Sequence, residues 1–179
     1  KEKSIVQIMI KNRVDGIIAA VAKHTTDISS FEQLKTMDIP VIHIVRELRT
    51  DCFSCVSVNN VEGAFKATDF LIKQGHSRIA HIMGPKTMPI SLSRFEGYQQ
   101  ALHKNNISFD KTLVTEVDFT LKETDKAMQK LMKLPNPPTG IFSFKNDITL
   151  DAIAFLKKKY PGRLGTIQFT DFGNLPFFK

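Results

Sequence analysis

The sequence has no tryptophan, two tyrosines and two cysteines among its 179 residues. No apolar run approaches the ~20 residues that a membrane-spanning helix needs. The first residues, Lys1 to Ser4, are not followed by the apolar stretch and small-residue cleavage site of a signal peptide. These absences exclude a membrane span and a disulfide-rich scaffold, and we expect a cytoplasmic protein. Its 42% hydrophobic and 24% charged residues are ordinary for a globular domain.

The two cysteines, Cys52 and Cys55, form a single Cys-x-x-Cys pair. One such pair supplies half of a structural zinc site, and its place before an expected strand does not match a thioredoxin motif. No two histidines have metal-ligand spacing with a carboxylate. We therefore expect two incidental thiols in a reducing compartment, no metal and no cofactor.

Motifs of nucleotide-dependent and hydrolytic enzymes are also missing. There is no G-x-G-x-x-G, no G-x-x-x-x-G-K-[ST] and no G-x-S-x-G. Asp147 and Asp171 are conceivable as an acid/base pair, but the sequence places no nucleophile beside them. The net charge of +7 comes from scattered lysines rather than an arginine-rich stripe, which favours an ordinary solvated surface over a nucleic-acid interface. We expect a protein that is not an enzyme.

What is present is an alternation of amphipathic segments with short apolar runs. Helical spacing predicts helices at 2–13, 29–37, 59–74, 92–105, 122–134 and 146–160. Apolar runs predict strands at 17–21, 41–45, 56–58, 79–83, 113–117, 141–144 and 164–169. Continuous apolar strands separated by helices are typical of parallel sheets buried on both faces, so the predicted fold class is α/β.

On such a sheet, ligands bind beyond the carboxyl ends of the strands. The residues at these places are polar or aromatic, and they form the candidate site: Arg46, Asn59, Arg94, Phe119, Asn146, Asp147, Thr170 and Asp171. Amides, carboxylates and a guanidinium can hold hydroxyls or a carboxylate, while a phenyl ring covers an apolar face. The set predicts a small polar ligand such as a sugar or a nucleotide base.

Several candidates also have a purely structural interpretation. Asn146 and Asp147 suit helix caps, and Arg46 suits an exposed loop. Arg94 is poorly placed for the helix dipole, which favours a ligand role. His43 and His81 lie inside apolar strands and are expected to be hydrogen-bonded core residues.

Six segments in order carry a family pattern. They are VDGII at 14–18, DIPVI at 38–42, VNNVEGA at 58–64, LIKQGHSRIA at 71–80, RFEGYQQAL at 94–102, and PTGIF at 138–142 followed by Asn146-Asp147. Together they resemble the lac repressor (LacI/GalR) family of bacterial transcription regulators over nearly the whole chain.

The resemblance implies a type I periplasmic-binding-protein-like fold, truncated at both ends, with two lobes that each hold a parallel sheet flanked by helices. Residues 1–59 would form part of the N-terminal lobe and residues 60–179 the C-terminal lobe. The family's effector lies between the lobes. By resemblance, Arg94 grips it, Asn146-Asp147 lines the pocket and Phe119 stacks on it.

The function implied is that of a ligand-sensing and dimerisation domain. Its effector, a sugar or sugar derivative, would modulate binding of operator DNA by an N-terminal helix-turn-helix that this sequence does not include. The alternative is a periplasmic-type solute-binding protein of the same fold, and Gly75-His76 with Arg94-x-x-Gly97-Tyr98 favours the regulator.

The sequence departs from the family at two candidate positions. Val45-Arg46 keeps only the arginine of the family's Asp-Arg pair. Thr170 replaces an aspartate that usually binds the effector. The identity of the ligand therefore stays open.

Overall fold

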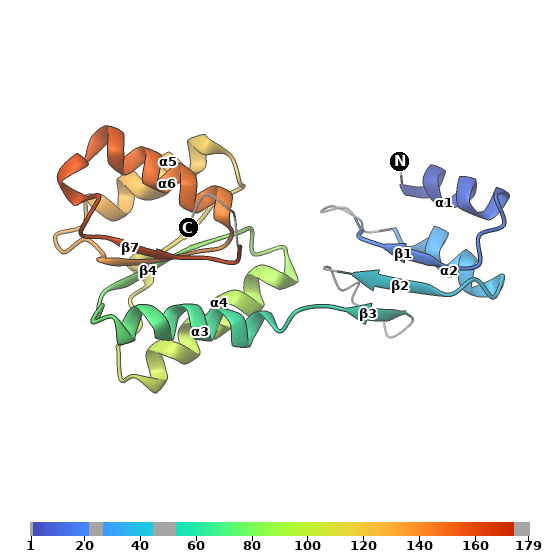
Figure 1. The fold of residues 1–179 in the computed structure, drawn as a ribbon, viewed down its shortest axis with the longest axis horizontal. Helices are drawn as coiled ribbons and strands as arrows, with labels where there is room; N and C mark the ends of the chain where they lie inside the picture. The colour runs from blue at the N-terminus through green and yellow to red at the C-terminus, as the bar shows by residue number, and fades with distance from the viewer. Residues whose placement is uncertain (1, 22–26, 45–52, 174–179) are drawn as a thin grey trace. The chain divides into compact units, whose positions relative to one another are not determined.

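The computed structural model describes residues 2–21, 27–44 and 53–173. Contacts divide the chain into two compact units, Lys1–Val58 and Asn59–Lys179. Each unit contains one sheet, and every strand pair in both sheets is parallel (Figure 1). The predicted α/β fold with parallel sheets flanked by helices is confirmed.

The first unit consists of α1 (Glu2–Lys11), β1 (Ile17–Ala19), α2 (Ser29–Thr36), β2 (Val41–Ile44) and β3 (Ser54–Val56), with strand order β1-β2-β3. Its core lies on one side of the sheet, where Ile17 and Val41 pack with Leu34 of α2. Alternate residues point to the opposite side. There Ile18 and Val56 are 71% and 64% exposed, so the prediction of strands buried on both faces is wrong for this sheet.

The second unit carries the other sheet, with strand order β5-β4-β6-β7. Its elements are α3 (Asn60–Lys73), β4 (Ile79–Met83), α4 (Pro89–Lys104), η1 (Lys111–Leu113), β5 (Val114–Glu116), α5 (Leu121–Met132), β6 (Gly140–Ser143), α6 (Asn146–Lys159), η2 (Pro161–Arg163) and β7 (Gln168–Thr170). Every residue of β4 and β6 is buried. Here the continuous apolar runs do mark strands covered on both faces.

The sheet of the second unit has a helical layer on each face, α3 with α4 on one and α5 with α6 on the other (Figure 1). On the α5–α6 face, Met128 and Leu156 pack with Ile82. On the α3–α4 face, Leu71 and Tyr98 pack with Phe142. The two layers hold the strand ends, and therefore the candidate residues that follow them, in fixed positions.

The close packing of α4 against α3 depends on Gly97 of α4. A Cβ atom at Gly97 would overlap the backbone oxygen of Val61 and lie 2.9 Å from the Cβ of Ala64. Only a residue without a side chain therefore lets α4 lie this close to α3.

A histidine links three separate segments of the second unit. Nδ1 of His76, just after α3, lies 2.9 Å from Oγ1 of Thr139, and its Nε2 lies 2.9 Å from Oε1 of Gln168. Thr139 directly precedes β6 and Gln168 begins β7. The ring thus fixes the amino-terminal ends of both strands.

Several predicted element boundaries are wrong, among them the following three. Helix α4 begins at Pro89 rather than at residue 92, because proline lacks an N–H and suits the first helical turn. Strand β3 lies two residues earlier than the expected 56–58. The expected strand 164–169 is replaced by a turn at 164–166 and the shorter β7, since Leu164 lies exposed in the turn rather than in the sheet.

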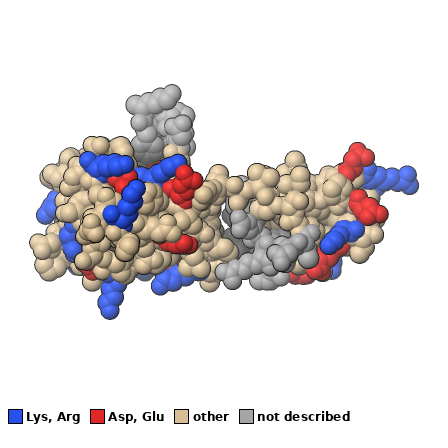
Figure 2. Space-filling model, turned by 90° about the horizontal axis from the view of Figure 1, so that it is seen from below, with Lys and Arg blue, Asp and Glu red and all other residues tan. Residues whose placement is uncertain are grey.

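The positive charge is spread over the surface. On the face in Figure 2, lysine and arginine side chains are interspersed with acidic ones. Several lysines form ion pairs with a neighbouring carboxylate, among them Lys73 with Asp69 and Lys126 with Glu123, both at 2.6 Å. Of the helices within the described ranges, none has the length and apolar character to cross a membrane.

Candidate functional site

Arg94 lies at the centre of the carboxyl edge of the second sheet. It is 7% exposed. Its Nε donates to Oδ1 of Asn60 at 3.0 Å, and Nη1 donates to the backbone oxygen of Phe144. The guanidinium carbon lies 3.7 Å from the ring centroid of Phe172 and 4.6 Å from that of Phe144. The arginine is therefore held in one orientation by two acceptors and two rings.

The partners of Arg94 are all uncharged. No Asp or Glu oxygen within the described residues lies within 4.0 Å of its guanidinium nitrogens. Burial lowers the pKa of Arg94 to about 10, so the side chain still carries its full charge at neutral pH. Within the described residues, the site thus contains a buried positive charge without a counter-charge, which is a costly arrangement in a protein interior.

Phe119 extends the aromatic contacts of Arg94. Its backbone has φ of +73°, an uncommon value for a bulky residue, and its ring centroid lies 5.2 Å from that of Phe144. The Nζ of Lys145 lies 4.9 Å from the centroid of the Phe119 ring. Phe119, Phe144, Arg94 and Phe172 form a continuous series of contacts, which we call the Arg94 stack.

Asn146 and Asp171 lie beside each other at the same edge. A Cβ built on Gly173 would lie 2.9 Å from Cβ of Asn146 and 3.4 Å from Oδ1 of Asp171. Asp147 instead accepts from Nζ of Lys145 at 2.6 Å, and its side chain is 63% exposed. Asn146 and Asp171 thus converge, whereas Asp147 faces its lysine partner.

The interpretation of Asn146 and Asp147 as helix caps is wrong. The N-cap of α6 is Lys145, which has an extended backbone and makes no side-chain cap hydrogen bond. Asn59 does cap a helix: its side chain accepts from the backbone N–H of Glu62 at 3.0 Å. A ligand role for Asn59 stays a prediction, and Arg46 lies outside the described residues.

Several buried hydroxyls have no hydrogen-bond partner in the part of the chain that the structure describes, and two of them lie towards the carboxyl edge of the second sheet. These two belong to Ser91 of α4 and Thr170 of β7. Ser91 is fully buried one turn before Arg94. Its Oγ would lie 2.7 Å from a Cβ on Gly84, and the Phe119 ring lies 2.9 Å from the same point. The edge thus offers hydroxyls as well as a charge.

Sequence reasoning missed Ser91, Asn60 and Phe144. Serine within a helix carries no pattern that distinguishes a buried position from an exposed one. Asn60 is the second residue of the helix predicted at 59–74, and Phe144 is the last residue of the strand predicted at 141–144. A signal for Phe144 existed, because a large aromatic at the carboxyl end of a central strand lies where ligands bind.

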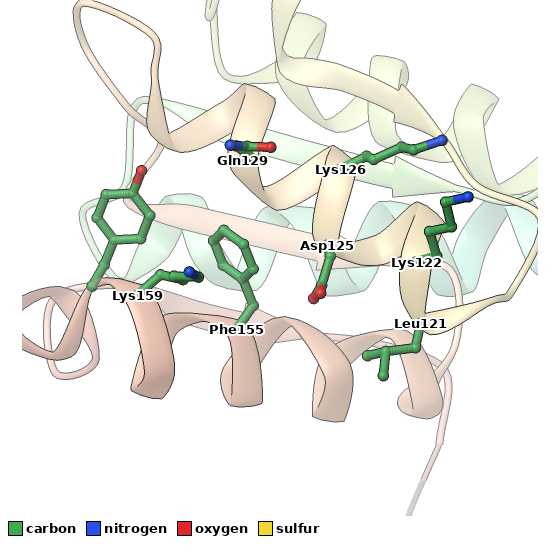
Figure 3. A pocket seen from close by; sticks show the side chains of 8 residues that line it. Leu121, Lys122, Asp125, Lys126, Gln129, Phe155 and Lys159 are labelled. Carbon is green, nitrogen blue, oxygen red and sulfur yellow. The ribbon is translucent and has the colours of Figure 1, made fainter.

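A separate hollow lies between α5 and α6 (Figure 3). Its volume is about 790 Å³, and it is lined by Leu121, Lys122, Asp125, Lys126, Gln129, Phe155, Lys159 and Tyr160. None of the predicted site residues lines it. We therefore centre the candidate site on the Arg94 stack.

The two strand histidines are buried as expected. His81 is stacked on Phe142, with ring centroids 4.5 Å apart, and its Nδ1 lies 2.9 Å from the backbone oxygen of Phe142. His43 has no hydrogen-bond partner among the described residues, so the expectation that it is hydrogen-bonded is wrong. Its ring packs between those of Phe31 and Phe53 instead.

The described part of the chain contains no group of three or more His, Cys, Asp or Glu side chains arranged to hold a metal. Cys55 is a free, exposed thiol in β3, and Cys52 lies outside the described residues.

The chain matches a family model described as a periplasmic binding protein domain over residues 1–178. It is 33% identical over 173 residues to the HTH-type transcriptional repressor CytR of Escherichia coli K12, a match that covers 94% of this chain and 50% of that protein. It is 31% identical over 159 residues to the HTH-type transcriptional repressor PurR of Actinobacillus pleuropneumoniae, covering 89% and 47% of the two chains. The chain thus spans about half the length of these relatives.

Solved structures show the same fold. A transcriptional regulator CelR–cellobiose complex superposes with a TM-score of 0.76 at 28% identity, covering 93% of this chain and 51% of that one. A regulatory protein of the LacI family from Chloroflexus aggregans gives a TM-score of 0.83 at 19% identity, covering 97% and 62%.

Proposed function

Because the chain belongs to the periplasmic binding protein domain family, among the LacI-family repressors, we propose that it is the effector-sensing domain of a bacterial transcription regulator. In this proposal it binds a small polar ligand, a sugar or sugar derivative. Ligand binding changes the affinity for operator DNA of a helix-turn-helix in the full-length protein. The regulator acts on DNA in the cytoplasm, as a homodimer that reads paired half-sites.

The observation that carries the proposal is the match to helix-turn-helix repressors along nearly the whole chain. These relatives are transcriptional repressors rather than enzymes. The same observation favours the regulator over a periplasmic-type solute-binding protein of the same fold. A regulator and a solute-binding protein differ in one simple property, which is selective binding of DNA by the full-length protein.

The ligand site of this proposal is the carboxyl edge of the second sheet. Arg94 supplies charged donors, Asn146, Asp171 and Thr170 supply polar groups, and Phe119 supplies an apolar surface. Such a mixture suits a hydroxyl-rich ligand better than an apolar one. The cellobiose named with CelR is consistent with a carbohydrate. Contributions from Arg46, Asn59 and Asp147 are part of the proposal.

The proposal is tested with Arg94→Ala in the full-length protein. Loss of a charged hydrogen bond costs about 1.5–3 kcal/mol, so effector affinity should fall roughly tenfold to a hundredfold. DNA binding without effector should stay intact, because Arg94 lies in the sensing domain. Fluorescence anisotropy on operator DNA, titrated with candidate sugars, measures both quantities. A variant that responds to effector like the wild type contradicts the role of Arg94, and a protein whose DNA affinity no small molecule changes contradicts the function.

A further inference from the structure

We infer that the ligand of this domain is an anion, a sugar derivative bearing a carboxylate or a phosphate, and that its charge is neutralised by Arg94. The inference rests on the proposed function, since it names the chemical class of ligand for the same site. It starts from the uncharged surroundings of a buried guanidinium.

Arg94 has five N–H donors, and the described residues use only the Nε donor, on Asn60, and one Nη1 donor, on Phe144. Both acceptors are neutral amide oxygens. The rings of Phe144 and Phe172 cover the guanidinium and contribute cation–π attraction. Hydrogen bonds and rings orient the arginine, but they leave its positive charge without a counter-ion and leave donors for a ligand.

The carboxylates of the carboxyl edge do not fill this role. Asp147 is engaged by Lys145 at 2.6 Å. Asp118 accepts from the backbone N–H of Thr120 at 3.0 Å and from its hydroxyl at 2.6 Å. Asp171 lies against Gly173, and none of its oxygens is within 4.0 Å of the Arg94 nitrogens. The charge of Arg94 is therefore available to a bound molecule.

Position 170 is one place from which a carboxylate of the described residues could reach Arg94. Thr170 pairs in register with Phe142, so their side chains point to the same face of the sheet. Phe142 packs on that face with Tyr98 of α4, the helix that carries Arg94. A threonine at this position contributes a buried hydroxyl without a partner and no charge. An acidic residue there would lie on the side of the sheet that bears Arg94.

The remaining groups fit the rest of such a ligand. A carboxylate or phosphate accepts from the fork of an arginine in charge-assisted hydrogen bonds, which are stronger than those to a hydroxyl. The unpartnered hydroxyls of Ser91 and Thr170 add donors towards the same edge of the sheet. A neutral sugar would satisfy the hydroxyls but would leave the buried charge uncompensated.

The test measures binding of matched compounds to the full-length protein by calorimetry. Each set contains a neutral sugar, its uronic acid and its phosphate, for example D-glucose, D-glucuronate and D-glucose 6-phosphate, with the galactose and ribose sets alongside. Inorganic phosphate and acetate probe the anionic group alone. We expect at least one acid or phosphate to bind roughly tenfold or more tightly than its neutral parent, the range of a charged hydrogen bond. Comparing the affinities of the uronic acid and of the sugar phosphate distinguishes a carboxylate ligand from a phosphate ligand.

Two variants of Thr170 give a matched control that does not depend on replacing the arginine. Thr170→Asp supplies a counter-charge, so it should bind the anionic compound roughly tenfold more weakly than Thr170→Asn does and have a higher Tm without ligand. Thr170→Asn has nearly the same shape as Thr170→Asp and also removes the Thr170 hydroxyl, so the difference in affinity and in Tm between the two variants measures the effect of the charge alone. Arg94→Met should abolish the preference for the anion over its neutral parent.

The inference is overturned if a neutral sugar binds as tightly as its acid and phosphate, or if the two Thr170 variants bind the anion equally well. It is also overturned if no anionic compound of the series binds the wild type. Tight binding of a neutral sugar with a change in DNA affinity would leave the proposed function standing while removing this inference.

Discussion

His81 makes the stability of the second unit depend on pH. Burial lowers its pKa from 6.5 to about 4, so the folded protein holds it neutral in a range where the unfolded chain binds a proton. The unfolding free energy should therefore be unaffected by this group above pH 6.5 and should fall as the pH drops towards 4. By pH 5 the loss from this group is about 2 kcal/mol.

Urea unfolding at pH 7.5 and pH 5 measures this effect. His81→Phe keeps a ring on Phe142 and removes the titrating group, so it serves as the control. The wild type should lose about 2 kcal/mol more than the variant between the two pH values. Equal losses in the two proteins would rule out His81 as the source.

At the residue scale, the sequence identified the position of Arg94 but not its surroundings. The place of Arg94 after a buried strand and its poor match to the helix dipole both indicated a functional role. That its acceptors are Asn60 and the backbone of Phe144 depends on how three elements pack, which no local pattern encodes. The same holds for Asp147, whose partner is its neighbour Lys145 rather than the helix start.

The contact between α3 and α4 should be the most sensitive helix packing in the second unit. Gly97→Ala places a methyl group against the backbone oxygen of Val61, which cannot move without moving α3. We expect a loss of about 1–3 kcal/mol in the free energy of unfolding, as for an overpacked core. Denaturant titration followed by circular dichroism gives the value.

Gly162→Ala is the matched control for this prediction, because nothing lies within 4 Å of a Cβ at that glycine. It should change stability by less than about 0.5 kcal/mol. A Gly97→Ala protein as stable as the Gly162→Ala protein would mean that the two helices separate at little cost.

At the element scale, the sequence predicted the order of the helices and most strands but not their ends. The buried strands β4 and β6 were the clearest, since both faces are covered and every residue is apolar or tightly packed. Strand β7 was the least clear, because Leu164 continues an apolar run into a turn. Whether an apolar residue is buried depends on the elements that pack around it, and Leu164 stays 39% exposed.

For the whole molecule, the scattered charge predicts weak and unselective contact with DNA. Base selectivity needs side chains delivered into a groove, and this sequence contains no helix-turn-helix to deliver them. We expect the 179-residue chain to bind operator-like and random DNA equally, with an affinity that disappears as salt is raised. A salt titration by anisotropy with both DNAs decides this. Sub-micromolar selective binding would contradict it.

His76 has a consequence for how this protein can evolve. One ring meets two side chains that lie 63 and 92 residues away along the chain, and each ring nitrogen has a single partner. In a neutral ring, one nitrogen donates and the other accepts, so Thr139 and Gln168 must supply complementary roles. A mutation of Thr139 or Gln168 leaves one ring nitrogen of His76 without its partner, and a mutation of His76 leaves both side chains without theirs. The residues at positions 76, 139 and 168 should therefore covary among related sequences. Single substitutions should be selected against, and substitutions that keep the hydrogen bonds complementary should persist.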